Sequence, residues 1–175
     1  MSELKFIFTG TPGAGKTTAI AAISDIPPVI TDTRTTDDLA DTKDATTVAM
    51  DFGEFTLDSG ETIRLYGTPG QKRFDFMWKI LTQGGLGLII LVDNSRPDPL
   101  RDLDIYLDNF AEFIEETGAV IGVTRMDLDD RTSLDHYYDH LYGKNIHLPL
   151  FETDVRKKDD VLILLDSLMT CLEYS

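Results

Sequence analysis

A glycine-rich stretch near the start of the chain has the residue types and spacing that bind phosphate groups. Residues 10–17 read GTPGAGKT and match the pattern G-x-x-x-x-G-K-[ST]. The glycines allow a tight loop whose N–H groups converge on a β-phosphate, the lysine reaches the β- and γ-phosphates, and the last hydroxyl can bind Mg²⁺. The expected nucleotide-binding residues are Gly13, Ala14, Gly15, Lys16, Thr17 and Thr18, and Lys16 is also a candidate catalytic residue. The motif predicts a nucleoside triphosphate ligand without distinguishing ATP from GTP.

Strands and helices are expected to alternate around this loop. Apolar runs and period-two patterns predict strands at residues 4–8, 48–57, 62–67, 86–93, 119–124 and 147–153, and helices are expected at 15–24, 100–114, 134–143 and 159–174. Residues 31–47 contain seven threonines and five aspartates, a composition that predicts a long mobile loop. The alternation predicts one α/β domain over residues 1–175, with a P-loop NTPase architecture: a six-stranded, mostly parallel sheet and helices on both faces.

Two further stretches occur in the order that a Ras-like G domain requires. TVAMDF (47–52) resembles the end of a first switch loop, and GTPGQKRF (67–74) resembles a second switch. The non-acidic residue before TPGQ makes the chain similar to the bacterial gliding-motility (Mgl-type), roadblock-associated branch of the Ras-like small GTPases. That resemblance implies a Ras-like G-domain fold, GTP or GDP as the ligand, Mg²⁺ as the cofactor, and a small dimeric roadblock/LC7 protein as the regulatory partner.

The same resemblance implies roles for particular residues. Thr47 would coordinate Mg²⁺ together with Thr17 and would sense the γ-phosphate. Gly70 would offer its N–H to the γ-phosphate, and Gln71 would be the catalytic residue that orients the attacking water.

Two stretches that follow predicted strands resemble base-recognition motifs of the same superfamily. TRMD (124–127) is similar to the guanine signature [Asn/Thr]-Lys-x-Asp, and TDVR (153–156) is a weaker match whose Val155 N–H would meet the guanine O6. A carboxylate at Asp127 accepts two hydrogen bonds from N1–H and N2–H of guanine, a pair of donors that adenine lacks, and a buried polar site of this kind can discriminate by on the order of 10⁴. Arg125, in place of the usual lysine, can stack over the base. The expected base-binding residues are Thr124, Arg125, Asp127, Val155 and Arg156.

The main departure from the family is Gly67, at the place where an acid usually supports Mg²⁺ through water. No strict replacement is expected, because Thr17, Thr47 and phosphate oxygens can supply ligands while waters complete the octahedron. Asp93 is expected to cap a turn rather than to support the ion through water. We therefore expect weaker magnesium affinity than in GTPases that have the acid, and tighter magnesium binding in Gly67→Asp.

The composition limits the classes of partner. The net charge of −15 argues against nucleic acid and against docking on anionic lipid by charge. The chain has one cysteine, Cys171, no apolar run of about 18 residues, no leader pattern and no lipidation signal. We expect a cytoplasmic protein without an intrinsic membrane anchor.

The sequence is compatible with three functions. The first is a GTP-binding switch that hydrolyses GTP slowly with Mg²⁺, is stimulated by a partner and changes the conformation of its switch loops, with Arg34 or Arg73 as a candidate arginine finger. The second is a nucleoside monophosphate kinase, which GTPGAGKTT also resembles, although the eight arginines form no lid-like cluster. The third is an ATP- or GTP-binding module without turnover.

Overall fold

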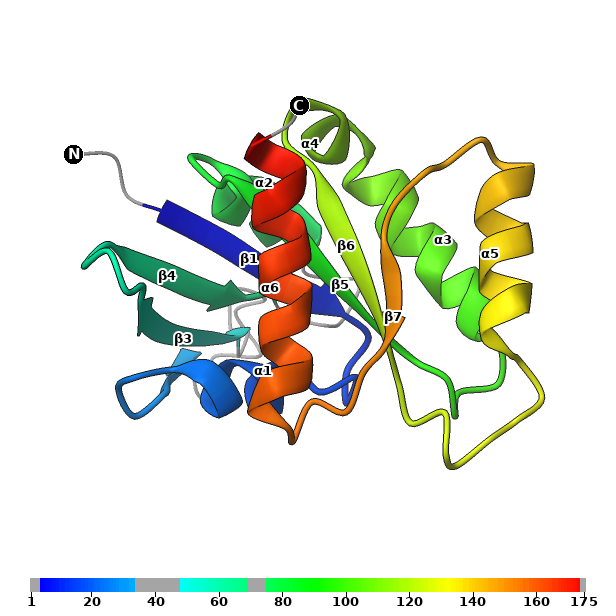
Figure 1. The fold of residues 1–175 in the computed structure, drawn as a ribbon, viewed down its shortest axis with the longest axis horizontal. Helices are drawn as coiled ribbons and strands as arrows, with labels where there is room; N and C mark the ends of the chain where they lie inside the picture. The colour runs from blue at the N-terminus through cyan, green and yellow to red at the C-terminus, as the bar shows by residue number, and fades with distance from the viewer. Residues whose placement is uncertain (1–3, 34–47, 69–74, 174–175) are drawn as a thin grey trace, which may run out of the picture.

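One mixed sheet organises the computed structural model, which describes residues 4–33, 48–68 and 75–173 (Figure 1). Its strands are β1 (Leu4–Gly10), β2 (Val29–Thr33), β3 (Val48–Thr56), β4 (Thr62–Gly67), β5 (Gly87–Asp93), β6 (Ala119–Thr124) and β7 (Leu150–Glu152), in the order β2-β3-β4-β1-β5-β6-β7. The pairings from β4 through β1, β5 and β6 to β7 are parallel, whereas β2 with β3 and β3 with β4 are antiparallel. Strands β5 and β6 are buried along their whole length, as their continuous apolar sequences predict.

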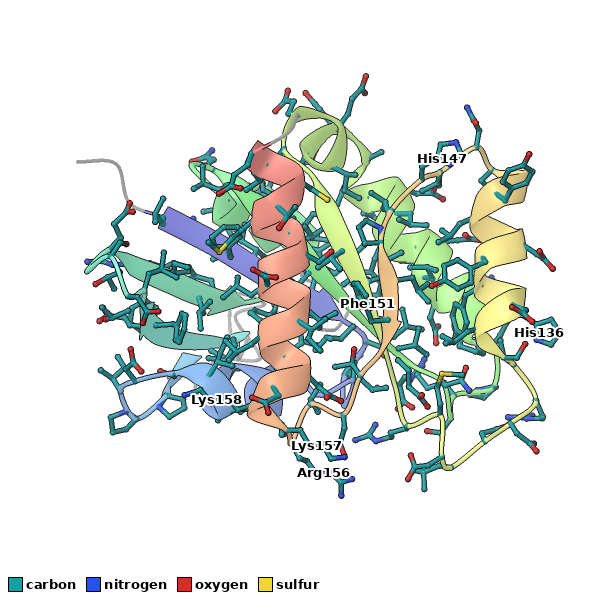
Figure 2. All side chains as sticks on the ribbon, viewed as in Figure 1. His136, His147, Phe151, Arg156, Lys157 and Lys158 are labelled. Atoms are coloured by element: carbon teal, nitrogen blue, oxygen red, sulfur yellow. The ribbon has the colours of Figure 1, made fainter. Side chains whose placement is uncertain are left out.

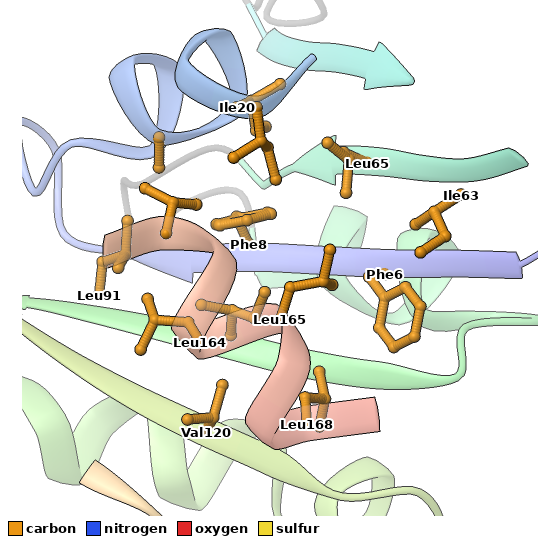
Figure 3. Close-up of a cluster of buried hydrophobic side chains, with 14 of the residues drawn as sticks. Phe6, Phe8, Ile20, Ile63, Leu65, Leu91, Val120, Leu164, Leu165 and Leu168 are labelled. Carbon is orange, nitrogen blue, oxygen red and sulfur yellow. The ribbon is translucent and has the colours of Figure 1, made fainter. Parts of the chain in front are cut away.

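Helices cover both faces of this sheet. They are α1 (Lys16–Ile23), α2 (Asp75–Thr82), α3 (Pro99–Asn109), α4 (Ala111–Glu116), α5 (Leu134–Gly143) and α6 (Lys158–Glu173). On one face, α1 and α6 enclose an apolar cluster that includes Phe8, Ile20 and Leu164 (Figure 3). On the other face, α2, α3 and α5 enclose a second cluster, in which the Trp78 and Phe110 rings stack at 5.1 Å. Within the described ranges, no helix combines the length and the apolar character needed to cross a bilayer.

The α/β fold class and the mostly parallel sheet are confirmed, with two local differences. Val29–Thr33, which overlaps the expected loop 31–47, forms an edge strand, so the described sheet has seven strands where six were expected. Its β-branched residues suit an extended strand paired with β3. The expected helix over 100–114 is interrupted at Phe110, where the backbone leaves the helical region (φ −106°, ψ 13°) before α4 begins.

The ends of three neighbouring parallel strands bring the predicted nucleotide residues to one edge of the sheet. Gly10 at the end of β1 is paired with Leu91 of β5, and Asp93 at the end of β5 is paired with Thr124 at the end of β6. Ligands of open α/β sheets bind at such carboxyl ends. The GTPGAGKT loop and the TRMD motif therefore meet at this edge, although they are distant in the sequence.

Candidate nucleotide-binding site

The loop between β1 and α1 depends on its glycines. Gly13 and Gly15 have φ values of 80° and 111°, in the left-handed region that other residues rarely adopt. Gly15 is the N-cap of α1, so the loop leads directly into the positive end of a helix whose first turn has no acidic residue. A Cβ on Gly15 would lie 2.8 Å from Cγ2 of Val155, so this glycine also lets the TDVR segment approach the loop. The backbone has the form that phosphate binding requires.

Lys16 is buried beneath the loop. Its Nζ donates to the backbone oxygens of Gly10 (2.7 Å) and Thr11 (3.0 Å). Burial lowers the pKa of Lys16 to about 8, while the carboxylate of Asp51 acts in the opposite direction. The ammonium group of Lys16 is thus held beside the loop by neutral carbonyl groups. A phosphate bound there would give it an anionic partner.

Thr124 and Arg125 join the TRMD motif to the phosphate loop. Thr124 Oγ1 donates to the backbone oxygen of Ala14 over 3.2 Å. Arg125 has a left-handed φ of 58°, and its Nη1 donates both to the backbone oxygen of Gly13 and to Oδ2 of Asp93. The guanidinium that was expected to stack over a base instead connects the two loops.

Asp93 caps the turn after β5, the role favoured from the sequence. Its Oδ1 accepts hydrogen bonds from N (2.9 Å) and Oγ (2.6 Å) of Ser95, and its Oδ2 accepts from Arg125. Burial alone would raise the pKa of Asp93, but these hydrogen bonds and the arginine charge hold that pKa below its usual value. Asp93 therefore stays ionised and positions Arg125.

A cavity of about 650 Å³ opens beside the phosphate loop, a volume in the range of small-molecule sites. Its lining brings together three segments that were predicted separately. Ala14, Gly15 and Thr18 come from the loop and α1, Asp127 comes from TRMD, and Val155 and Arg156 come from TDVR. The carboxyl group of Asp127 is on an exposed side chain at this cavity. The predicted phosphate and base residues therefore border one continuous space.

The TDVR segment contains an ion pair between Asp154 and Arg156. Nε and Nη2 of Arg156 each lie 2.9 Å from the Asp154 carboxylate, and these hydrogen bonds lower the pKa of Asp154 to about 2. Arg156, Lys157 and Lys158 lie together at the start of α6 (Figure 2). Arg156 is therefore paired with Asp154 next to Val155, while 76% of its side chain is exposed.

Asn94 and Tyr137 hold the loop that follows TRMD, and we did not predict this from the sequence. Asn94 is buried, and its Nδ2 donates to the backbone oxygens of Asp129 (2.9 Å) and Thr132 (3.0 Å). Its Oδ1 accepts from the Tyr137 hydroxyl over 2.6 Å. The available signal was an asparagine directly after a buried strand, where amide side chains commonly bind neighbouring backbone.

Thr17 offers a hydroxyl to a divalent cation at the start of α1. Its Oγ1 donates to Oδ2 of Asp51 in β3 over 2.6 Å. Hydroxyl and carboxylate oxygens are ligands that Mg²⁺ accepts, and Mg²⁺ usually completes its shell with phosphates and waters. Within the described part of the chain, no three His, Cys, Asp or Glu side chains are arranged to hold a metal ion. The residues present fit an Mg²⁺ ion that binds with the nucleotide.

The remaining predicted residues lie outside the described ranges. These are Thr47, Gly70, Gln71, Arg34 and Arg73. The magnesium ligand, the γ-phosphate contact, the water-orienting group and the arginine finger that they were expected to provide stay predictions, as does the cytoplasmic location.

Replacing Arg125 with alanine should weaken nucleotide binding by about 10-fold. The change removes two charge-assisted hydrogen bonds between TRMD, the phosphate loop and Asp93, a loss of roughly 1–2 kcal/mol. Calorimetric titration with nucleotide measures the effect. Arg131→Ala is the matched control, because Arg131 pairs with Asp129 in the same loop and its side chain is 66% exposed. Equal losses in the two variants would contradict the connecting role of Arg125.

Comparisons with known proteins agree with a nucleotide site. A family model described as "Conserved hypothetical ATP binding protein" matches residues 8–166, which include the phosphate loop, TRMD and TDVR. An uncharacterized protein of Methanocaldococcus jannaschii is 36% identical over 59 residues. That match covers 34% of this chain and 38% of the length of the relative.

The family match overturns one expectation. The resemblance to the gliding-motility (Mgl-type) branch of the Ras-like small GTPases is wrong, because a different family model covers residues 8–166. The expected roadblock/LC7 partner depended on that resemblance and loses its support. The misleading signal was the pair of stretches 47–52 and 67–74, since a few residues around a phosphate can recur in proteins of different function.

Proposed function

Because this chain belongs to the family described as conserved hypothetical ATP-binding proteins, and so binds a nucleotide, we propose that its ligand is a purine nucleoside triphosphate. The phosphates lie on the loop of residues 10–17, and the base lies in the cavity beside Asp127. The observation that carries the proposal is that the phosphate loop and the cavity beside Asp127 form one continuous space. Gly15 caps the helix at the phosphate loop and also lines the cavity that contains Asp127.

Guanine is the base that the chemistry of the cavity favours. The Asp127 carboxylate can accept from N1–H and N2–H of guanine together, whereas adenine presents a lone pair at N1 that the carboxylate would repel. Val155 on the facing segment would add a backbone N–H suited to a carbonyl oxygen such as guanine O6, whereas the backbone N–H of Arg156 donates to Oδ1 of Asp154 over 3.0 Å. Adenine is the second candidate base, supported by the description of the family as ATP-binding.

Slow hydrolysis of the bound triphosphate is part of the proposal. Lys16 would stabilise charge on the phosphates, and Gln71 would orient the attacking water. A binding module without turnover is the alternative, and release of inorganic phosphate by nucleotide-saturated protein distinguishes the two. A monophosphate kinase is less well supported, because Arg125 and Arg156 are already engaged with Asp93 and Asp154 rather than free to clamp a second nucleotide.

The test is a competition experiment on nucleotide-free protein. Fluorescent GDP is bound first, and unlabelled GTP, GDP, ATP and CTP are then compared as competitors, with and without Mg²⁺. We expect GTP and GDP to compete at least about 100-fold better than ATP, since adenine cannot donate to the Asp127 carboxylate and instead places the N1 lone pair against it. If ATP competes as well as GTP, the adenine candidate is favoured over guanine. Binding that CTP matches, or no binding of any nucleotide, would contradict the purine site.

A further inference from the structure

Asp51 borders the space that a side chain at position 67 would enter. In the antiparallel pairing of β3 with β4, Asp51 lies directly opposite Gly67. A Cβ on Gly67 would lie 3.2 Å from both Cβ and Oδ2 of Asp51 and 3.3 Å from Cδ1 of Ile20. From the sequence we expected no replacement for the acid missing at Gly67. A carboxylate is nevertheless present at this place, supplied by the neighbouring strand.

The Asp51 carboxylate is buried and faces the start of α1. Its side chain belongs to a residue that is 7% exposed, and its Oδ2 accepts the Thr17 hydroxyl over 2.6 Å. Its charge also acts on the buried ammonium group of Lys16. A carboxylate removed from water needs donors or cations around it. Asp51 therefore contacts Thr17 and acts by charge on Lys16, the two side chains of the phosphate-loop motif that are expected to bind metal and phosphate.

The Thr17 hydroxyl can serve Asp51 and a metal ion at the same time. A hydroxyl has one proton to donate and two lone pairs to offer. Donation to Asp51 uses the proton and leaves the lone pairs for a cation. Partners of this kind orient metal ligands and make them more basic, and their loss commonly costs 10–100-fold in metal affinity.

We propose that Asp51, placed opposite Gly67, is the carboxylate that supports the Mg²⁺ ion accompanying the nucleotide phosphates. This inference rests on the proposed phosphate site, but not on the choice of base or on hydrolysis. Asp51 is a positioning residue that acts through Thr17. The glycine and the aspartate are complementary, because a Cβ at position 67 would make tight contacts of 3.2 Å with Asp51 and would press on this rotamer.

Two consequences separate this role from a structural one. Without metal, the Asp51 charge repels the phosphates, so Asp51→Asn should keep or raise the nucleotide affinity measured in EDTA. With metal, the same variant should need at least about 10-fold more Mg²⁺ to reach its full affinity. The expectation for Gly67→Asp also changes: a second carboxylate beside Asp51 is crowded and repelled, so it should not tighten magnesium binding. The double variant Asp51→Ala with Gly67→Asp carries one carboxylate at this pair of positions, now on β4 instead of β3. It should recover most of the magnesium dependence of nucleotide affinity that Asp51→Asn loses.

The experiment measures nucleotide affinity in EDTA and across a titration of Mg²⁺, and repeats it with Mn²⁺ while the bound ion is counted by electron paramagnetic resonance. Glu54→Gln is the matched control, because Glu54 lies on the same strand, carries the same charge and faces Arg64 rather than the loop. We expect the control to behave as wild type. An unchanged Mg²⁺ response in Asp51→Asn, with its EDTA affinity intact, would overturn this inference alone. Failure of wild type to bind nucleotide in either condition would instead overturn the proposed function.

A second measurement needs no variant, so it holds even where Asp51→Asn does not fold. Wild-type protein is prepared with aspartate labelled with ¹³C at the carboxyl carbon and is loaded with nucleotide and Mn²⁺. Electron–nuclear double resonance should then detect coupling between the ion and a labelled carboxyl carbon. Absence of that coupling would contradict the placement of Asp51 beside the metal.

Discussion

Asp127→Asn should lower the affinity for GTP and GDP by on the order of 10²–10⁴ while leaving the protein folded. The exposed Asp127 side chain at the cavity is the group that would accept both donors of guanine, and an amide in its place offers one acceptor and one donor. The amide NH₂ would then face N2–H of guanine, donor against donor. Competition binding with GDP, GTP and ATP measures the loss, and circular dichroism verifies the fold.

The same variant should gain a new ligand. Xanthine keeps N1–H and carries a carbonyl oxygen where guanine has its amino group, so the asparagine amide can pair with both positions. Xanthosine triphosphate should therefore bind the variant better than GTP does, reversing the order found in wild type. Asp130→Asn is the control, since Asp130 is an exposed acid of the same loop that does not line the cavity. Equal affinity of wild type and Asp127→Asn for GTP would exclude base recognition by Asp127.

The parts of the site that could be predicted are those formed by residues that are close together in the sequence. The GTPGAGKT loop needs glycines in the left-handed conformation and a helix after it, and a few consecutive residues specify both. TRMD could be placed at the same edge because the parallel strands of such a sheet all end there, as β1, β5 and β6 do. Local patterns of this kind determine backbone form and topology.

Contacts between distant segments could not be predicted in the same way. Asp51 meets Thr17 because α1 packs beside β3, where the register on β4 sets Asp51 opposite a glycine. The turn between β3 and β4 can fix that register, but nothing in the sequence places α1 against β3. Arg125 was given a role at the base from its place in a motif, but the nearest acceptors in space, Gly13 and Asp93, determine where its guanidinium points. The residues that tune a site are often fixed by such neighbours rather than by motif position.

Lys16→Met should reduce affinity for nucleoside triphosphates by on the order of 10²–10³. The variant keeps an unbranched side chain, shorter by one atom, but loses the charge-assisted hydrogen bonds to phosphate, each worth roughly 1.5–3 kcal/mol. The variant also loses the Nζ hydrogen bonds to the backbone oxygens of Gly10 and Thr11, so circular dichroism should verify that the free protein is folded. Titration with GTP and ATP measures the loss, and Lys79→Met, an exposed lysine on α2, is the control. A loss of less than threefold would mean that Lys16 does not contact the phosphates.

The pH dependence of binding gives an independent test of Lys16. Because the pKa of Lys16 in the free protein is about 8, nucleotide should bind with little pH dependence below that value. Above it, the protein must take up a proton to present the ammonium group, so affinity should fall by up to about tenfold per pH unit.

The stability of the free protein should change with pH in the opposite sense to the nucleotide affinity. The unfolded chain, with an ordinary lysine pKa of 10.5, binds more protons between pH 8 and 10.5, so the unfolding free energy attributable to Lys16 rises across that interval. Lys16→Arg keeps its charge throughout and should lose both trends, whereas a pH profile shared by wild type and Lys16→Arg would assign the titration to another group.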